Sequence, residues 1–324
     1  MVLHDGATRL RLEQLASPAC GPRQVRLRIE ACGVCRTDLH IVDAELKNPV
    51  LPLIPGHETV GRITEIGREV HGLAAGQRVG VPWLGRTCGQ CPHCRAGREN
   101  LCDAPGFTGY TLNGGYADEC VADAAYVFAL AEDADPVGLA PLLCAGLIGY
   151  RSYAMAGDAP RLGFYGFGAA AHILAQIAVW QDRDVYAFTR PGDRPAQDFA
   201  RQLGAVWAGG SDASPGVLLD AAIIFAPVGA LIPTALKAVR KGGRVICAGI
   251  HMSDIPSFPY ADLWHERQVM SVANLTRQDG DAFFPLAARA GVQTQTTPYP
   301  LEDANLALDD LRKGHLQGAA VLVP

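Results

Sequence analysis

The feature that most constrains the fold of this chain is an apolar stretch that ends in closely spaced glycines and continues into a helical pattern. Residues 161–165 have the composition of a buried strand, the turn after them is Gly166-x-Gly168-x-x-Ala171, and residues 173–180 are apolar and helical in character. Small residues at these places permit a tight turn, close approach of the backbone to a pyrophosphate, and close packing of helix on strand. With a second strand at residues 184–188, the pattern predicts a dinucleotide-binding βαβ unit.

The same alternation of strand and helix continues beyond this unit. A helix is predicted through residues 199–203, a strand at 217–225, a helix at 230–239, a turn at 241–244 and a strand that ends at 248. Right-handed units of this kind form a parallel, doubly wound sheet, which binds its cofactor at the carboxyl ends of the strands. The residues predicted to contact the cofactor are Gly166, Phe167, Gly168, Ala169, Ala226 and Ile250.

The end of the second strand bears on the type of cofactor. An acidic residue there binds the ribose 2′-hydroxyl of NAD, whereas an arginine accommodates the 2′-phosphate of NADP. The chain has Thr189-Arg190 at this place and Arg194 shortly after it, so charge favours NADP over NAD. Asp193 could turn back toward the ribose, and that alternative keeps NAD open.

The first part of the chain has a different periodicity. Apolar and polar residues alternate at residues 25–29, 60–66 and 76–81, with glycine and proline between these segments. Such alternation is typical of short antiparallel strands with one buried face. We therefore predict a partly open β-barrel in the first part of the chain.

A candidate metal site is formed by residues of this first part. Cys35, His57 and Cys144 supply two thiolates and an imidazole, and three protein ligands leave a fourth position of zinc open, as in catalytic sites. The segment Gly56-His57-Glu58-x-x-Gly61-x5-Gly67-x2-Val70 matches the zinc signature of the medium-chain alcohol dehydrogenases, and residues 33–40 and 143–146 are similar to that family in the same order. The chain thus resembles the zinc-dependent medium-chain alcohol dehydrogenases over nearly its whole length.

The resemblance implies a chaperonin-10-like barrel and a set of catalytic residues beside the metal. Thr37 and His40 match the hydroxyl and imidazole that carry the substrate proton out of the site, with the cofactor ribose between them. Asp38 matches the carboxylate that orients the ring of a zinc-bound histidine. Glu58 would approach the metal during substrate exchange or act through its charge alone.

Three further residues take their expected roles from the resemblance. Arg36 matches a position that contacts the cofactor pyrophosphate, although a solvated surface arginine is the alternative. Trp83 and Leu84 match a stretch that lines the alcohol pocket, where an indole would narrow the space around small substrates. A core aromatic side chain beneath the loop is the alternative for Trp83.

A second cysteine cluster, Cys88-x2-Cys91-x2-Cys94-x7-Cys102, predicts another zinc site. Four thiolates close the tetrahedral shell, so this site would be structural and would supply folding energy to a polar lobe at residues 85–105. The prediction is therefore two Zn²⁺ ions per chain.

Length and composition set the remaining bounds. A chain of 324 residues is expected to form two domains. The change of periodicity places a catalytic barrel domain at residues 1–145 and a dinucleotide-binding domain at 146–274, and the family's chain then returns to the catalytic domain at 275–324. A net charge of -5 gives no electrostatic argument for nucleic acid or a membrane surface, and the first residues have no apolar signal segment. We expect a cytoplasmic protein.

The predicted function is zinc-dependent, reversible hydride transfer between a primary or secondary alcohol and NAD(P). Reduction of an aldehyde with NADPH is the alternative direction, and a cofactor-binding protein without turnover is the rival from another class. The substrate would be a small alcohol or aldehyde. A homodimer or homotetramer is expected because members of the family form them.

Overall fold

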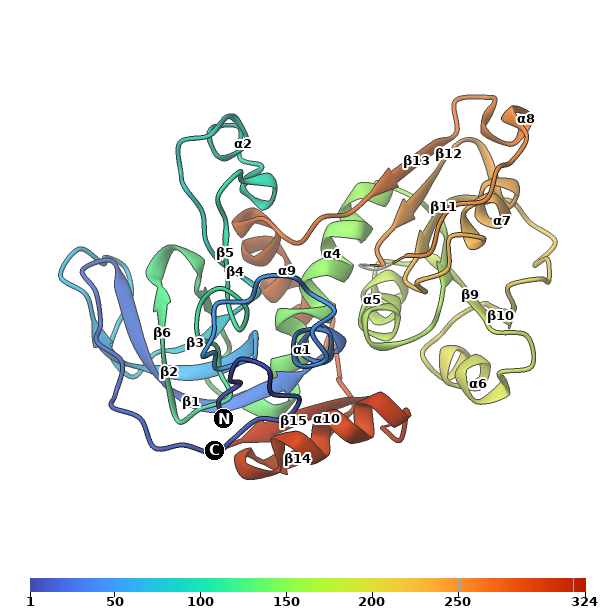
Figure 1. Ribbon diagram of the computed structural model, residues 1–324. Coiled ribbons are helices and arrows are strands. Elements are labelled where there is room, and N and C mark those ends of the chain that lie inside the picture. Colours follow the sequence, from blue (N-terminus) through green and yellow to red (C-terminus); the bar gives the residue numbers. More distant parts are fainter. Residues whose placement is uncertain (250–251, 317) are drawn as a thin grey trace. The chain divides into compact units, whose positions relative to one another are not determined.

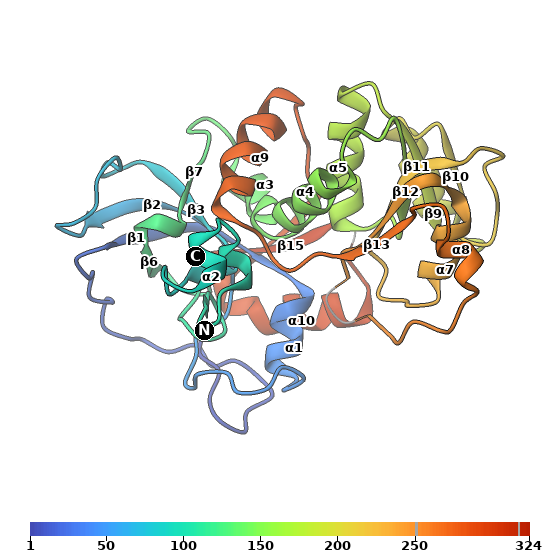
Figure 2. The ribbon, with the colours of Figure 1, turned by 90° about the horizontal axis from the view of Figure 1, so that it is seen from above.

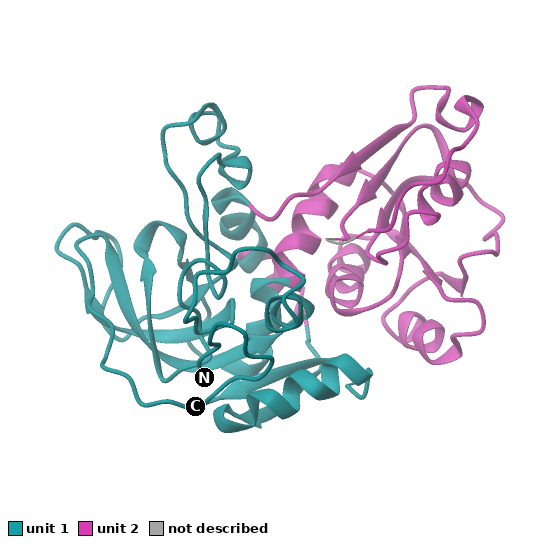
Figure 3. Cartoon of the chain, in the orientation of Figure 1, with its two compact units in different colours: residues 1–144, 276–284, 293–324 teal, residues 145–275, 285–292 magenta. Residues whose placement is uncertain are grey.

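The chain folds into two compact units, each of which has its own sheet (Figure 3). The structure is a computed structural model that describes residues 1–249, 252–316 and 318–324. Unit 1 consists of Met1–Cys144, Thr276–Phe284 and Gln293–Pro324, and unit 2 of Ala145–Leu275 and Pro285–Val292. The sequence places all of residues 275–324 with the first domain, whereas Pro285–Val292 groups with unit 2.

The main sheet of unit 1 has the strand order β14-β15-β1-β2-β3-β7, and β6 also pairs with β1 (Figure 1). Its pairs are antiparallel except for β14 with β15, and β1 alternates buried with exposed side chains over its first half, as the period-2 sequence predicts. The strands of this sheet are β1 (Gln24–Val34), β2 (Glu58–Ile66), β3 (Arg78–Val81), β6 (Glu119–Asp123), β7 (Phe128–Ala129), β14 (Thr296–Pro300) and β15 (Ala319–Val323).

Short helices and a small second sheet complete unit 1. The small sheet consists of β4 (Leu84–Arg86) and β5 (Gly106–Phe107). The helical segments are α1 (Arg36–Val42), α2 (Pro92–Arg95), α3 (Pro136–Leu139), α10 (Ala304–Lys313) and the 3₁₀ turns η1 (Glu99–Leu101), η2 (Ala124–Tyr126), η3 (Ala140–Leu143) and η4 (Leu301–Asp303). Helix α9 (Arg277–Arg289) begins in unit 1 and ends in unit 2.

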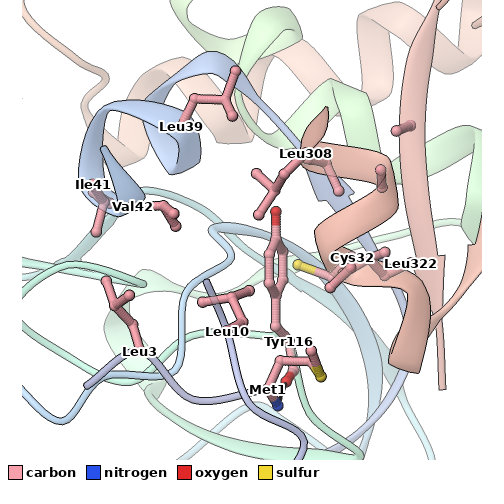
Figure 4. Packing of buried hydrophobic residues seen from close by; sticks show 14 of the residues in the cluster. Met1, Leu3, Leu10, Cys32, Leu39, Ile41, Val42, Tyr116, Leu308 and Leu322 are labelled. Carbon is pink, nitrogen blue, oxygen red and sulfur yellow. Dashed lines mark hydrogen bonds between the residues drawn. The ribbon is translucent and has the colours of Figure 1, made fainter. Parts of the chain in front are cut away.

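Helix α1 is held in place by a buried apolar cluster. Figure 4 shows Tyr116 upright among side chains of this cluster, to which α1 contributes Leu39, Ile41 and Val42 and α10 contributes Leu308. A helix of seven residues is not stable alone in water, so packing must supply its stability. Full burial of each such side chain contributes roughly 1.5–3 kcal/mol. The cluster therefore fixes the helix that carries Thr37 and His40.

The sheet of unit 2 is parallel throughout, in the order β10-β9-β8-β11-β12-β13. Its strands are β8 (Arg161–Tyr165), β9 (Asp184–Thr189), β10 (Trp207–Gly210), β11 (Leu219–Ile224), β12 (Val239–Cys247) and β13 (Gln268–Ser271). The helices are α4 (Ala145–Ala156), α5 (Ala169–Trp180), α6 (Arg194–Gln202), α7 (Leu231–Ala238) and α8 (Tyr260–Leu263). Helices α4 and α5 pack against each other, because Gly149 leaves room for Leu174 (Figure 2). The predicted class, a chaperonin-10-like barrel plus a doubly wound parallel sheet, is confirmed.

One local prediction was wrong. The turn predicted at residues 241–244 lies inside β12, which begins at Val239 and passes through Gly242 with a φ of +70°. A glycine adopts that conformation at little cost, so the strand continues through an irregularity where the sequence suggests a turn.

Candidate functional site

The three predicted ligands Cys35, His57 and Cys144 lie together in unit 1, and Glu58 joins them. Their ligand atoms lie within 4.8 Å of one another. Cys35 is the N-cap of α1, His57 directly precedes β2, and Cys144 lies between η3 and α4. The end of β1 pairs with the start of β2, which brings Cys35 and His57 together although 22 positions separate them.

The chemistry of this cluster fits a divalent cation. His57 Nε2 and Glu58 Oε2 are buried and have no hydrogen-bond partner among the described residues. Burial raises the pKa of Glu58 well above its usual value, and the negative charge of Cys35 adds to that effect. Buried polar atoms without partners are costly, and a metal ion would satisfy them. Two thiols and an imidazole are a donor set that zinc prefers.

The two thiols of the cluster interact directly. Cys35 Sγ lies 3.9 Å from Cys144 Sγ, and this contact, with the nearby His57 ring, holds the pKa of Cys35 well below its usual value. The same contact raises the pKa of Cys144. Burial lowers the pKa of His57, but the charges of Asp38 and Cys35 outweigh burial and raise it. Without a cation the site therefore holds protons on some of its ligands, and zinc would replace them.

Asp38 connects the ligands to the backbone. Its side chain is fully buried; Oδ2 accepts a hydrogen bond from Cys35 N at 2.9 Å, and Oδ1 accepts one from Gly56 N at 3.2 Å. Oδ1 also lies 3.3 Å from His57 Nδ1. One carboxylate thus contacts both sides of the site, in the arrangement by which a carboxylate orients a metal-binding histidine.

The residues predicted to move a proton lie on α1. Thr37 is buried, and its backbone N donates to Cys35 Sγ at 3.3 Å, so this residue lies directly beside the first ligand. His40 is partly exposed, and its Nδ1 contacts Glu45 Oε2. The sequence reasoning did not identify Glu45, since no local motif marks it.

Two glycines make room for the site. A Cβ atom at Gly33 would lie 1.8 Å from Glu58 Oε2, so any other residue there would displace the carboxylate. Gly56 has a φ of +96°, and a Cβ there would lie 2.3 Å from the Tyr116 ring. The backbone beside the ligands therefore depends on residues without side chains.

Trp83 is half-buried beside the ligand His57. Its ring lies 5.0 Å from the His57 ring in an edge-on arrangement and stacks on Phe107 and Tyr110, at 5.0 and 5.7 Å. These two partners were not predicted, although both follow the second cysteine cluster in the sequence. Leu84 is fully buried and offers no surface to a substrate. Its predicted pocket role was wrong, because its side chain is enclosed by the protein core.

The second cysteine cluster also converges. The ligand atoms of Cys88, Cys91, Cys94 and Cys102 lie within 4.8 Å of one another, and the ten cysteines of the chain are all free thiols. Backbone N–H groups donate to Cys88 Sγ and Cys102 Sγ at 3.2 to 3.3 Å. Such bonds hold the pKa of Cys91 at about 6, whereas burial raises that of Cys102 to about 11. The four sulfurs form a closed shell suited to a structural zinc.

An ion pair between a buried glutamate and a half-exposed arginine attaches this lobe to α9. Glu99 Oε1 accepts hydrogen bonds from the backbone N of Arg277 at 2.9 Å and from its Nε at 3.1 Å. Glu99 is 4% exposed, and the Arg277 guanidinium lies 5.4 Å from the Tyr126 ring centroid. These residues are 178 positions apart, so no local pattern predicts the contact.

The predicted dinucleotide turn joins β8 to α5 in unit 2. Gly166 has a φ of +89°, and a Cβ there would lie 2.9 Å from the backbone N of Ala226. Gly168 is the N-cap of α5 and makes no side-chain cap, while Phe167 is partly exposed and Ala169 exposed. The first N–H groups of α5 therefore face outward at a helix N-terminus, an arrangement that suits a phosphate.

The residues at the end of β9 and after it, which were predicted to bind the cofactor, differ in their exposure to solvent. Thr189 is buried, and its hydroxyl bonds Gln197 Nε2 at 3.0 Å and Arg190 O at 3.0 Å, whereas Arg190 and Arg194 are exposed. Asp193 caps α6 by accepting a hydrogen bond from Ala196 N at 3.2 Å. The predicted contact at Ile250 lies outside the described residues. Arg36 is exposed at the start of α1, and its predicted contact with the cofactor stays a prediction.

Unit 1 carries two clusters of metal-binding side chains, and unit 2 has a parallel sheet with a dinucleotide turn. Together these features are typical of a metal-dependent dehydrogenase. Comparison with known proteins identifies the family. Residues 21–132 match the model of the alcohol dehydrogenase GroES-like domain. A probable alcohol dehydrogenase of Mycobacterium tuberculosis is 46% identical over 314 residues, which cover 94% of this chain and 90% of that protein. The chain belongs to the zinc-dependent medium-chain alcohol dehydrogenase family.

Solved structures agree with this assignment. The acetophenone reductase of Geotrichum candidum in complex with NAD has a TM-score of 0.86 at 27% identity, and covers 100% of this chain and 96% of its own. The cinnamyl alcohol dehydrogenase of Helicobacter pylori complexed with NADP(H) has a TM-score of 0.82 at 25% identity, with 94% and 91% covered. Among the described residues, no helix is long and apolar enough to span a membrane.

Proposed function

We propose that this protein is a zinc-dependent alcohol dehydrogenase, which transfers hydride reversibly between a small primary or secondary alcohol and a nicotinamide cofactor. The observation that carries the proposal is the convergence of Cys35, His57 and Cys144 beside a helix that presents a hydroxyl and an imidazole. The relatives that share most of the chain are named alcohol dehydrogenases, which supports the same reaction.

Different residues of unit 1 have different roles in the proposed reaction. Zinc, held by Cys35, His57 and Cys144, would polarise the substrate hydroxyl so that hydride can leave the adjacent carbon for the nicotinamide. Thr37 accepts the proton that the substrate hydroxyl loses, and His40 delivers it to water. Asp38 orients the His57 ring, and Glu58 places a buried carboxyl group beside the ligands. Trp83 forms an aromatic wall that limits the width of the substrate.

We assign a second, structural zinc to Cys88, Cys91, Cys94 and Cys102, so that each chain binds two ions. Their sulfurs converge, and the lobe around them consists largely of short turns with little buried apolar surface. A closed shell of thiolates would provide the folding energy that packing does not.

NADP is the proposed preferred cofactor. Arg190 and Arg194 are exposed directly after β9, and Asp193 is engaged as the cap of α6. A carboxylate that caps a helix is less available to a ribose hydroxyl, while two guanidinium groups attract a 2′-phosphate. The same charges support reduction of an aldehyde with NADPH as the alternative direction.

Self-association into homodimers or homotetramers is the proposed assembly. Strand β13 is at an edge of the sheet of unit 2, and Val269 on it is 37% exposed. Tyr260 and Trp264 in the preceding segment are 68% and 55% exposed. An apolar edge strand with aromatic neighbours is a template for pairing with another chain. Light scattering of the purified protein would count the subunits, and Val269→Lys should shift the population toward monomer.

The deciding experiment measures reduction of NAD and of NADP with a panel of short aliphatic and benzylic alcohols, on protein with a measured zinc content. Turnover with kcat/KM at least about 10-fold higher for NADP is expected, and Arg190→Ala should reduce only that value, by about 10-fold. Arg289→Ala removes an exposed charge elsewhere in unit 2 and serves as the control. Absence of turnover with either cofactor in zinc-loaded protein would instead favour a binding protein.

A further inference from the structure

The chain after α1 turns back on the helix in a way that directs one carboxylate at His40. Helix α1 ends at Val42, and the backbone N of Glu45 donates to His40 O at 2.8 Å while that of Ala44 donates to Ile41 O at 3.2 Å. These two bonds form a Schellman motif. The motif places the side chain of Glu45 over the last turn of α1, where Glu45 Oε2 contacts His40 Nδ1.

The central residue of this turn, Ala44, adopts an unfavourable backbone conformation. Ala44 has a φ of +57°, in the left-handed region that glycine adopts freely and that costs another residue roughly 1–2 kcal/mol. Arg312 holds the turn from the other side, since its Nη2 lies 2.8 Å from Asp43 Oδ1 at the C-cap. The position of Glu45 therefore depends on the backbone hydrogen bonds of the turn and on the ion pair between Asp43 and Arg312.

The contact determines which ring nitrogen of His40 carries the proton. A carboxylate oxygen can only accept a hydrogen bond, so in this contact His40 Nδ1 is the donor. In a neutral imidazole with its proton on Nδ1, Nε2 carries none and is the basic nitrogen. The side chain of His40 is 16% exposed and that of Glu45 58% exposed, so Glu45 lies on the solvent side of the ring.

We propose that Glu45 is a positioning residue for proton transfer: it holds His40 in the tautomer that presents a basic Nε2 toward the reaction, and it stabilises the imidazolium that forms. The inference rests on the proposed function, in which His40 takes the substrate proton. In oxidation, the alcohol O–H bond breaks, the proton reaches His40 Nε2 by way of Thr37, and the imidazolium then loses a proton to water. Glu45 remains a carboxylate throughout.

The chain contains a matched control for this contact. His4 Nε2 and Glu13 Oε1 form another histidine–glutamate pair in unit 1, at 2.5 Å, with side chains 37% and 32% exposed. Neither residue lies on α1 or in the metal cluster. Glu13→Ala removes the same kind of interaction without touching the relay, so it reports the effect of losing a surface pair alone.

The first measurement is the tautomer of His40, by ¹⁵N NMR of the imidazole nitrogens in zinc-loaded protein without substrate. The His40→Gln variant assigns the signals of this ring among the nine histidines. We expect the wild-type ring to carry its proton on Nδ1 and the Glu45→Ala ring to show a mixture of tautomers. Wild-type and Glu45→Ala spectra with the same tautomer would overturn the proposal. This readout is independent of turnover.

The second measurement is steady-state alcohol oxidation by the same variants. Glu45→Ala should lower kcat by roughly 10-fold with little change in KM, because general base catalysis contributes at least 10²-fold and part of the population keeps the productive tautomer. Glu45→Gln retains an acceptor oxygen without charge and should recover part of the loss, while Glu13→Ala should leave kcat within about 2-fold.

The two proposals fail in different ways. If His40→Gln lowers kcat and Glu45→Ala does not, the role of Glu45 is refuted and the relay stands. If His40→Gln leaves turnover intact, the relay itself is refuted, and with it the kinetic role of Glu45, whatever the spectrum shows. Equal melting temperatures of Glu45→Ala and wild type would confirm that the loss of kcat is not a loss of folded protein.

Discussion

Replacement of Asp38 by asparagine tests whether this carboxylate holds the metal ligands Cys35 and His57 in position. The two carboxylate oxygens accept hydrogen bonds from Cys35 N at 2.9 Å and Gly56 N at 3.2 Å, and Oδ1 lies 3.3 Å from His57 Nδ1. Asparagine has nearly the same shape but replaces one oxygen with an NH₂ group. In either orientation of the amide, its NH₂ group then faces at least one of these N–H groups, so that two donors oppose each other. The negative charge of the carboxylate is also lost.

The size of the effect follows from those contacts. A hydrogen bond to a charged group contributes about 1.5–3 kcal/mol, and residues that orient metal ligands change metal affinity by about 10- to 100-fold when altered. Since 1.4 kcal/mol corresponds to tenfold, the two estimates agree on a loss of about 1.4–2.8 kcal/mol. We therefore expect Asp38→Asn to weaken zinc binding at the Cys35 site by one to two orders of magnitude.

Competition with a chelating dye, followed by metal analysis, measures this loss directly. The variant should release one zinc at a chelator concentration that leaves the Cys88 site loaded, and turnover should fall with the released ion. Asp279→Asn is the control, because Asp279 is a buried carboxylate of unit 1 that instead bonds Thr276 N and Oγ1, both at 2.7 Å. Equal zinc release from Asp38→Asn and wild type would show that Asp38 does not organise the ligands.

Three further predictions concern the parts that support the site. Cys91→Ser should reduce the zinc content from two ions to one and lower the melting temperature by roughly 5–10 °C, as read by metal analysis and calorimetry; unchanged zinc would refute the structural site. Glu99→Gln should cost unit 1 about 1.5 kcal/mol of unfolding free energy with both ions retained, and a stability equal to wild type in denaturant titrations would contradict the role of the Arg277 pair. Burial raises the pKa of Asp220, but hydrogen bonds from Arg240 and Arg161 outweigh it and hold the pKa below its usual value. Since the folded pKa is the lower one, this carboxylate stabilises unit 2 above about pH 4 and the gain is lost as pH falls further. Asp220→Asn should cost about 2 kcal/mol at pH 7 and less at pH 3; a pH-independent loss would refute the charge argument.

Much of the site could be predicted because its parts are encoded by short spacings. The cysteines of the lobe fall within 15 residues, and the turn after β8 needs small residues at fixed offsets from one another. Cys35 and His57 are brought together by the pairing of β1 with β2, and alternation in the sequence marks both strands. The class of fold and the family were confirmed for this reason, while the roles of individual residues stay predictions.

Helix α1 could not be predicted from its own residues, because contacts with other parts of the chain stabilise it. Helix α1 contains Thr37, Asp38 and Val42, which have low helix propensity, and it forms because Cys35 and Asp38 cap it and the apolar cluster around Tyr116 packs against it. Leu84 was misassigned because a motif match gave adjacent residues the same role, whereas Trp83 is partly exposed and Leu84, the first residue of β4, is fully buried.

The contacts that could not be predicted from the sequence are those in which one of the two residues belongs to no recognisable motif. Glu99 is an acidic residue in a polar lobe, and only the folded chain shows that it is buried against Arg277. Glu45 lies in a stretch without any recognisable spacing, and its relation to His40 depends on a left-handed residue at Ala44 that composition does not indicate. Because a motif records the residues that touch the metal or cofactor, it omits the residues that hold those in place. Positioning residues of this kind must therefore be sought among the hydrogen-bond partners of the motif residues. Among the described residues, Asp38 contacts the proposed ligand His57, and Glu45 contacts the proposed base His40.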